Sequence, residues 1–191
     1  QGFSTLQDVL MDAVAKVDLH LEPNTLRKAA VRHLRSQFKL VMTLIRRLLV
    51  LMALEIALPE AEAPEPRKKE DRDTERAPRP HAWAFALMPI YREYNLAYLK
   101  ALGERPRPPA EPVPAAPWLH RWRTLSALLR SPEQAALRMA KLLRKIKRTG
   151  GLRPHAMPIE RSYRLPAEPA LIAGILPDMV NDGLQAYWDT G

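Results

Sequence analysis

The chain contains no cysteine, and only seven of its 191 residues are glycine. Without cysteine it can form no disulfide framework, thiolate zinc site or iron–sulfur centre, and it has no cysteine nucleophile. The scarcity of glycine argues against glycine-rich loops that cradle phosphates. No serine-hydrolase elbow, Walker loop or dinucleotide-binding glycine pattern occurs. These absences exclude the enzyme classes that short motifs most readily indicate.

Metal-ligand patterns are missing as well. The five histidines are spread over the chain, and none forms a pair four residues apart or follows a known pattern with carboxylates. The acid pairs at helical spacing are explained by solvent exposure. We therefore expect no metal, no cofactor and no enzymatic activity.

Long apolar runs are also absent. The most hydrophobic stretch, residues 40–58, contains Arg46, Arg47 and Glu55. Its longest charge-free run is seven residues, against the ~20 that a membrane-spanning helix needs. We expect no transmembrane segment. No signal-like segment stands near the first residues, and alanine, arginine and proline are frequent, which together favour a protein of the bacterial cytoplasm.

Helical spacing of apolar residues dominates the sequence, and no stretch alternates like a strand. This pattern predicts an all-α fold, with a long amphipathic helix and a helical hairpin joined by charged and proline-rich linkers. The expected segments are a helical unit (3–58), a charged proline-rich linker (59–81), an aromatic-rich helix (82–104), a proline-rich spacer (105–117), a basic helical hairpin (118–151) and an irregular tail with two short helices (152–191).

Individual helix boundaries follow from capping residues and helix breakers. Ser4 is a plausible first cap, and the first apolar stripe continues to Leu21. The absence of glycine and proline from Thr25 to Leu58 predicts one helix of 34 residues. The strongest local signal begins at Ser131, which is followed by Pro132 at the expected first helical position.

Positive charge is concentrated in two blocks. The chain has 30 Lys and Arg against 21 Asp and Glu, a formal net charge of +9. Residues 23–58 carry +6 and residues 119–153 carry +9, while both ends of the chain are acidic. Within each block the cations fall on one face of a helix, opposite apolar residues. The faces comprise Arg138, Lys141, Arg144, Lys145 and Arg148 in the second block, and Lys28, Arg32, Arg35 and Lys39 in the first.

Such faces predict contact with phosphates that sets affinity without reading sequence. The sequence thus favours a non-enzymatic adaptor or regulator that contacts an anionic partner, with nucleic acid preferred. Four alternatives stay open: a sequence-reading helix-turn-helix, a purely structural protein scaffold, peripheral membrane attachment through the long basic helix, and faces that are only solvated. The apolar residues 40–58 are expected to pack against later helices, a protein partner or a second copy of the chain.

Overall fold

The computed structural model describes residues 2–59, 85–88, 112–159 and 165–190. Within these ranges the all-α prediction is confirmed. The helices are α1 (Gly2–Ala15), α2 (Lys28–Glu55), α4 (Ala116–Arg130), α5 (Glu133–Arg148) and α6 (Ala167–Asp189), with a 3-10 turn η1 (Leu19–Leu21) and two short strands, β1 (Thr25–Leu26) and β2 (Val113–Pro114). Almost all of the predicted aromatic-rich helix and most of the linkers at 59–81 and 105–117 lie outside the described residues.

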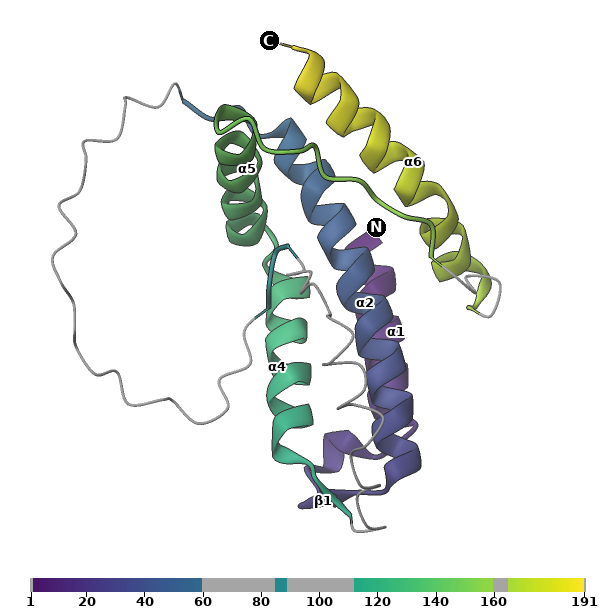
Figure 1. The fold of residues 1–191 in the computed structure, drawn as a ribbon. Helices are drawn as coiled ribbons and strands as arrows, with labels where there is room; N and C mark the ends of the chain where they lie inside the picture. The colour runs from purple at the N-terminus through teal and green to yellow at the C-terminus, as the bar shows by residue number, and fades with distance from the viewer. Residues whose placement is uncertain (1, 60–84, 89–111, 160–164, 191) are drawn as a thin grey trace, which may run out of the picture.

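Helix α2 is the central element, and the other helices are arranged around it (Figure 1). Helix α1 runs antiparallel to α2 and also contacts α4 and α6. Helices α5 and α6 pack against the C-terminal half of α2. Near its N-terminal end, α2 meets α4, where the Phe38 and Trp118 rings lie 6.1 Å apart between centroids. One hydrophobic core therefore joins all the described helices.

The second half of α2 is buried from several sides, as its apolar sequence predicts. Leu49 is fully buried, and Val50 and Ala53 are 7% and 5% exposed. Helices α5 and α6 of the same chain cover this half of α2. Leu143 of α5 and Tyr187 of α6 line a cavity beside its end. Much of the apolar stretch 40–58 is thus buried inside the molecule. The surface expected to bind a protein partner or a second copy is correspondingly reduced.

The predicted 34-residue helix is interrupted near its start. Thr25 and Leu26 form β1, which pairs antiparallel with β2 so that Thr25 faces Pro114 and Leu26 faces Val113. The helix itself begins at Lys28 and ends at Glu55. Pairing with a segment almost ninety residues away overrides the local helical pattern, as tertiary contacts often do.

The remaining helix ends also differ from expectation. Helix α1 begins at Gly2, not Ser4, and ends at Ala15. The chain then passes through left-handed conformations at Asp18 and Glu22 (φ 54° and 53°), on either side of η1. The two short terminal helices expected in 152–191 are one helix, α6, which continues through a buried Pro177. Proline removes one hydrogen bond, but packing of both halves of α6 compensates for it.

The basic segment 118–151 contains two consecutive helices, as expected, but they do not lie along one another. Helix α4 packs chiefly on α1, whereas α5 packs on α2. The expected cap at Ser131 is displaced, since Pro132 occupies the cap position and no side chain caps α5. The two helices are therefore positioned by α1 and α2 and not by a hairpin interface.

Two glycines in α6 offer a matched test of its packing. An added Cβ at Gly174 meets nothing within 4 Å, whereas at Gly183 it lies 2.8 Å from Cδ1 of Leu54. Gly174→Ala is expected to raise the free energy of unfolding by about 0.5–1 kcal/mol, because alanine favours the helix. Gly183→Ala should gain less or lose stability, since Leu54 must move. Denaturant titration measures both, and equal gains would contradict the packing of α6 on α2.

Candidate anion-binding site

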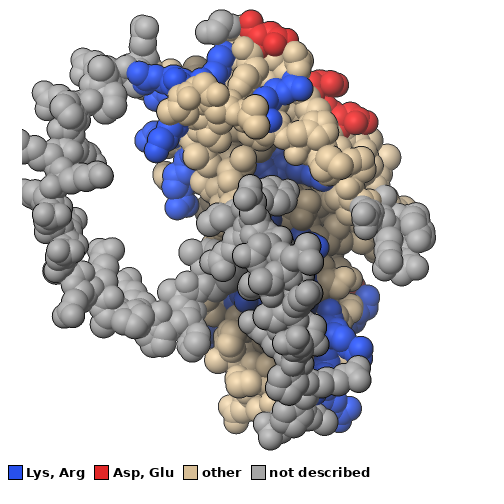
Figure 2. All heavy atoms as spheres, in the orientation of Figure 1, with Lys and Arg blue, Asp and Glu red and all other residues tan. Residues whose placement is uncertain are grey.

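Helix α5 separates an apolar side from a cationic side. Ala136, Met139 and Leu143 are at most 1% exposed and face the core. On the opposite side, four of the five predicted cations are exposed and one, Arg144, is half-buried. The exposed cations are Arg138, Lys141, Lys145 and Arg148. Burial of the apolar side fixes the rotation of α5, and that rotation directs the cations to solvent (Figure 2).

No carboxylate of the described residues neutralises this face. The ion pairs among the described residues, Lys16 with Asp12 at 2.8 Å and Arg123 with Glu22, involve no residue of α5. Arg138 donates from Nε to the Gln134 carbonyl at 3.2 Å, which is a neutral acceptor within α5. Arg144 donates from Nη1 to the Pro59 carbonyl at 2.6 Å. Neither guanidinium group forms an ion pair with a described carboxylate.

The second predicted face is exposed too, but it lies elsewhere. Lys28, Arg32, Arg35 and Lys39 all reach solvent on the N-terminal half of α2. Figure 2 shows Lys and Arg over α5 at the upper left and over this part of α2 at the lower right, with tan surface and further Lys and Arg between them. The structure therefore does not bring the nine predicted cations together.

The cations on α2 lie close to a further cation, Arg121 on α4. The pKa of Arg121 on α4 is lowered, first by burial of its guanidinium and second by the nearby charge of Arg35. The Arg121 guanidinium also lies 5.0 Å from the centroid of the Trp118 ring. This region is thus a junction of α2 and α4 where cations contribute to packing, and it is a weaker candidate for an anion than α5.

Two residues near the C-terminal end of α5 were not predicted as site residues from the sequence. Lys147 points away from the predicted face and donates to the Tyr187 carbonyl at 2.6 Å, with its Nζ 4.9 Å from the Tyr187 ring centroid. Trp188 follows on α6 and is partly exposed. No spacing in the sequence relates α5 to the last turn of α6, so only the folded chain shows this proximity.

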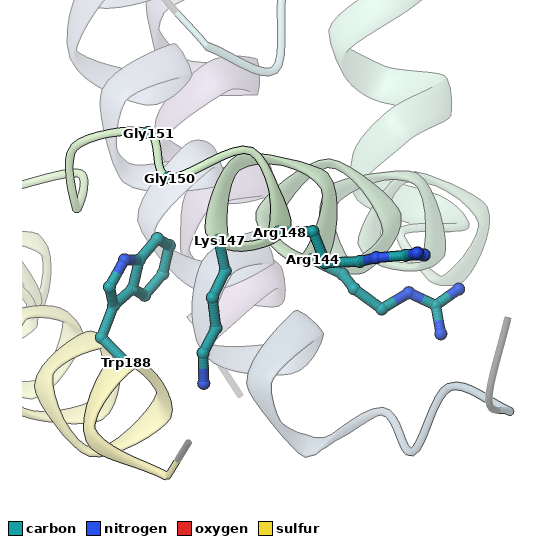
Figure 3. A pocket seen from close by; sticks show the side chains of 6 residues that line it. All are labelled: Arg144, Lys147, Arg148, Gly150, Gly151 and Trp188. Atoms are coloured by element: carbon teal, nitrogen blue, oxygen red, sulfur yellow. The ribbon is translucent and has the colours of Figure 1, made fainter. Parts of the chain in front are cut away.

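These residues surround an open depression of about 620 Å³ (Figure 3). Its lining consists of Arg144, Lys147, Arg148, Gly150, Gly151 and Trp188. Figure 3 shows Trp188 on the α6 side, the glycine turn along one edge, and Arg144 and Arg148 extending from α5 on the side away from Trp188. Cations and an indole therefore border one concave surface.

The glycine turn at this edge has a defined geometry. Gly150 adopts φ +67°, and the amides of Gly150 and Gly151 donate to the carbonyls of Lys147 and Ile146 at 3.1 and 2.9 Å. This is a Schellman ending, which favours glycine. A Cβ at Gly151 would lie 2.8 Å from Cγ2 of Ile146. The turn consequently leaves backbone, without side chains, along the edge of the depression.

Arg47 is the buried exception among the cations. Its side chain is 8% exposed, and burial lowers the pKa of its guanidinium. It donates to the Met157 carbonyl, while its Nη1 has no partner among the described residues. Nearby, the backbone amide of Ala156 donates to Asn181 Oδ1 at 2.8 Å, and Asn181 Nδ2 donates to the Ala156 carbonyl at 3.1 Å. These bonds fasten the segment after α5 across α2 and α6, which is a structural role.

The outer face of α6 has the opposite charge. Asp178 and Asp182 are exposed on it beside an apolar row four residues apart, in which Leu171, Ile175 and Met179 are 64%, 47% and 50% exposed. Figure 2 shows the acidic side chains gathered at the upper right, away from the α5 cations. The outer face of α6 thus carries negative charge, whereas the exposed side of α5 carries positive charge.

Comparison with protein-family models, with curated proteins and with solved structures gives no match. Among the described helices, none is both long enough and apolar enough to cross a bilayer. In the same part of the chain, no group of three or more His, Asp or Glu side chains is placed to hold a metal ion.

Proposed function

We propose that the protein is a non-enzymatic adaptor or regulator that binds nucleic acid through phosphate contacts made by α5. The observation that carries the proposal is the one-sided, solvent-facing row of cations on α5, none of which forms an ion pair with a described carboxylate. A phosphate backbone supplies anions at regular spacing along such a row. Neutralising those phosphates releases condensed counterions, which is the main source of non-specific affinity.

The distribution of charge along α5 favours backbone contact over base readout. In a helix-turn-helix, the first residues of the second helix approach the base edges. Here the first turn of α5 holds Glu133, which repels phosphates, and the cations follow from Arg138 onward. Long cationic side chains in the later turns suit phosphates and carry no sequence code. The expected binding is therefore tolerant of sequence.

The proposal predicts a steep dependence of affinity on salt. If the five α5 cations each contact one phosphate, log K should fall against log salt with a slope of about −3 to −5. Fluorescence anisotropy with a labelled oligonucleotide at several salt concentrations measures this slope. Affinity weaker than ~10⁻⁴ M at low salt, for single strands and duplexes alike, is below ordinary non-specific binding and would overturn the proposal.

A further inference from the structure

The depression at the end of α5 combines the two elements that single-stranded nucleic acid requires. Proteins that bind single strands pair a cationic track for the backbone with aromatic rings on which bases stack. In the depression, Arg144 and Arg148 belong to the cationic row, and Trp188 contributes an indole. A base in a duplex is stacked on its neighbours and cannot reach such a ring. This inference rests on the proposed phosphate contact.

The position of Trp188 is fixed by contacts between α5 and α6. Lys147 joins the two helices through the Tyr187 carbonyl and ring. The Tyr187 and Trp188 rings meet edgewise, with centroids 5.4 Å apart and planes at 67°. The indole is thereby held in the last turn of α6 while part of it stays exposed. A pre-positioned ring loses little conformational freedom when a base stacks on it.

The depression is large enough to admit an extruded base. Its volume of about 620 Å³ falls within the ~300–1,000 Å³ of small-ligand pockets. The Gly150–Gly151 turn leaves no side chain along one edge, and Figure 3 shows the indole of Trp188 beside that turn. Asp189, which follows Trp188 in the sequence, accepts a hydrogen bond from Gln185 at 2.7 Å. Its carboxylate is therefore partly satisfied within α6.

We propose that Trp188 is a base-stacking platform that makes this protein prefer single-stranded over duplex nucleic acid, with α5 holding the adjacent phosphates. The preference is for the base face and the phosphate, not for a particular base. DNA and RNA single strands of equal length are therefore expected to bind alike. A row of cations without the indole has no means of favouring a single strand over a duplex.

Four labelled probes test the inference: oligo(dT), oligo(rU), an abasic strand and a duplex, each of roughly twelve nucleotides, within known site sizes. Oligo(dT) and oligo(rU) should bind about 10–100-fold more tightly than the abasic strand, since a stacked base contributes on that scale. Trp188→Ala should remove this difference and leave abasic and duplex binding unchanged. Trp188→Phe should keep most of it, while losing the quenching of indole fluorescence that stacking produces.

The outcomes separate the two proposals. If the wild-type protein binds none of the probes, phosphate contact by α5 fails and the stacking proposal falls with it. If it binds all four equally, with the expected salt slope, only the stacking proposal is overturned. If Trp188→Ala also loses binding to the abasic strand, Trp188 stabilises the packing of α6 beside the end of α5. That result would overturn the stacking role. A strong preference for one sugar would contradict a site made of base face and phosphate alone.

Discussion

Replacing Lys141, Lys145 and Arg148 together by glutamine is expected to weaken nucleic-acid binding about 100-fold or more at ~0.1 M salt and to reduce the salt slope by about 2–3. All three side chains are exposed on α5, and none forms an ion pair with a described residue. Glutamine is a good helix former, so α5 should remain intact. Anisotropy titrations at several salt concentrations measure both effects.

The chain offers a matched control for this variant. Arg32, Arg35 and Lys39 are also exposed, on α2, and replacing them by glutamine likewise removes three positive charges. Because long-range interactions between exposed charges are screened beyond ~10 Å at 0.1 M salt, this variant should bind almost as well as the wild type. Equal weakening by the two triple variants would mean that net charge alone drives binding and that α5 is not the site.

Leu49→Asp is expected to abolish cooperative folding. Leu49 is fully buried in the half of α2 that α5 and α6 cover. An aspartate there places an unpaired charge in an apolar core, which costs several kcal/mol in addition to the lost packing. Domains of this size are stable by only about 5–15 kcal/mol. Far-UV circular dichroism should show loss of helix, and thermal unfolding should lose its sharp transition.

An identical substitution on the outer face of α6 provides the comparison. Leu171 is 64% exposed, so Leu171→Asp should change the free energy of unfolding by no more than about 0.5 kcal/mol, as surface substitutions usually do. If Leu49→Asp unfolds as cooperatively as Leu171→Asp, residues 48–54 are not enclosed by α5 and α6. In that case they would again be available as an interface for a partner.

Helix existence was predictable from the sequence where an apolar stripe is strong. The stripe through Met139 and Leu143 identified α5 and the side on which its cations stand, because burial of one face fixes the direction of the other. The fully apolar stretch after Leu48 likewise predicted enclosure, since no exposed helix can leave so much apolar surface in water. These inferences need only local periodicity.

Boundaries were less predictable, because they depend on distant partners. Thr25 and Leu26 have no local reason to leave a helix, and they do so to pair with Val113 and Pro114. Pro177 normally ends a helix, yet α6 continues through it because residues on both sides are buried in one core. Contacts with distant segments, not local backbone propensity, decided each of these cases.

One part of the candidate site was predictable from the sequence, and the other part was not. The row of α5 cations could be read from the chain because five side chains share one helix. The depression could not, since it requires Trp188 to lie beside Lys147, about forty residues earlier, through the contact with Tyr187.

The amino-acid sequence by itself determined that the chain is helical, lacks the motifs of thiol and nucleotide chemistry, and carries its excess positive charge on single faces of two helices. Only the tertiary structure decided that those two faces lie apart, that α5 and α6 cover the apolar end of α2, and that an indole borders one basic face. The physical reason is range: periodicity and charge are properties of consecutive residues, whereas proximity between helices is set by how their buried faces pack around α2.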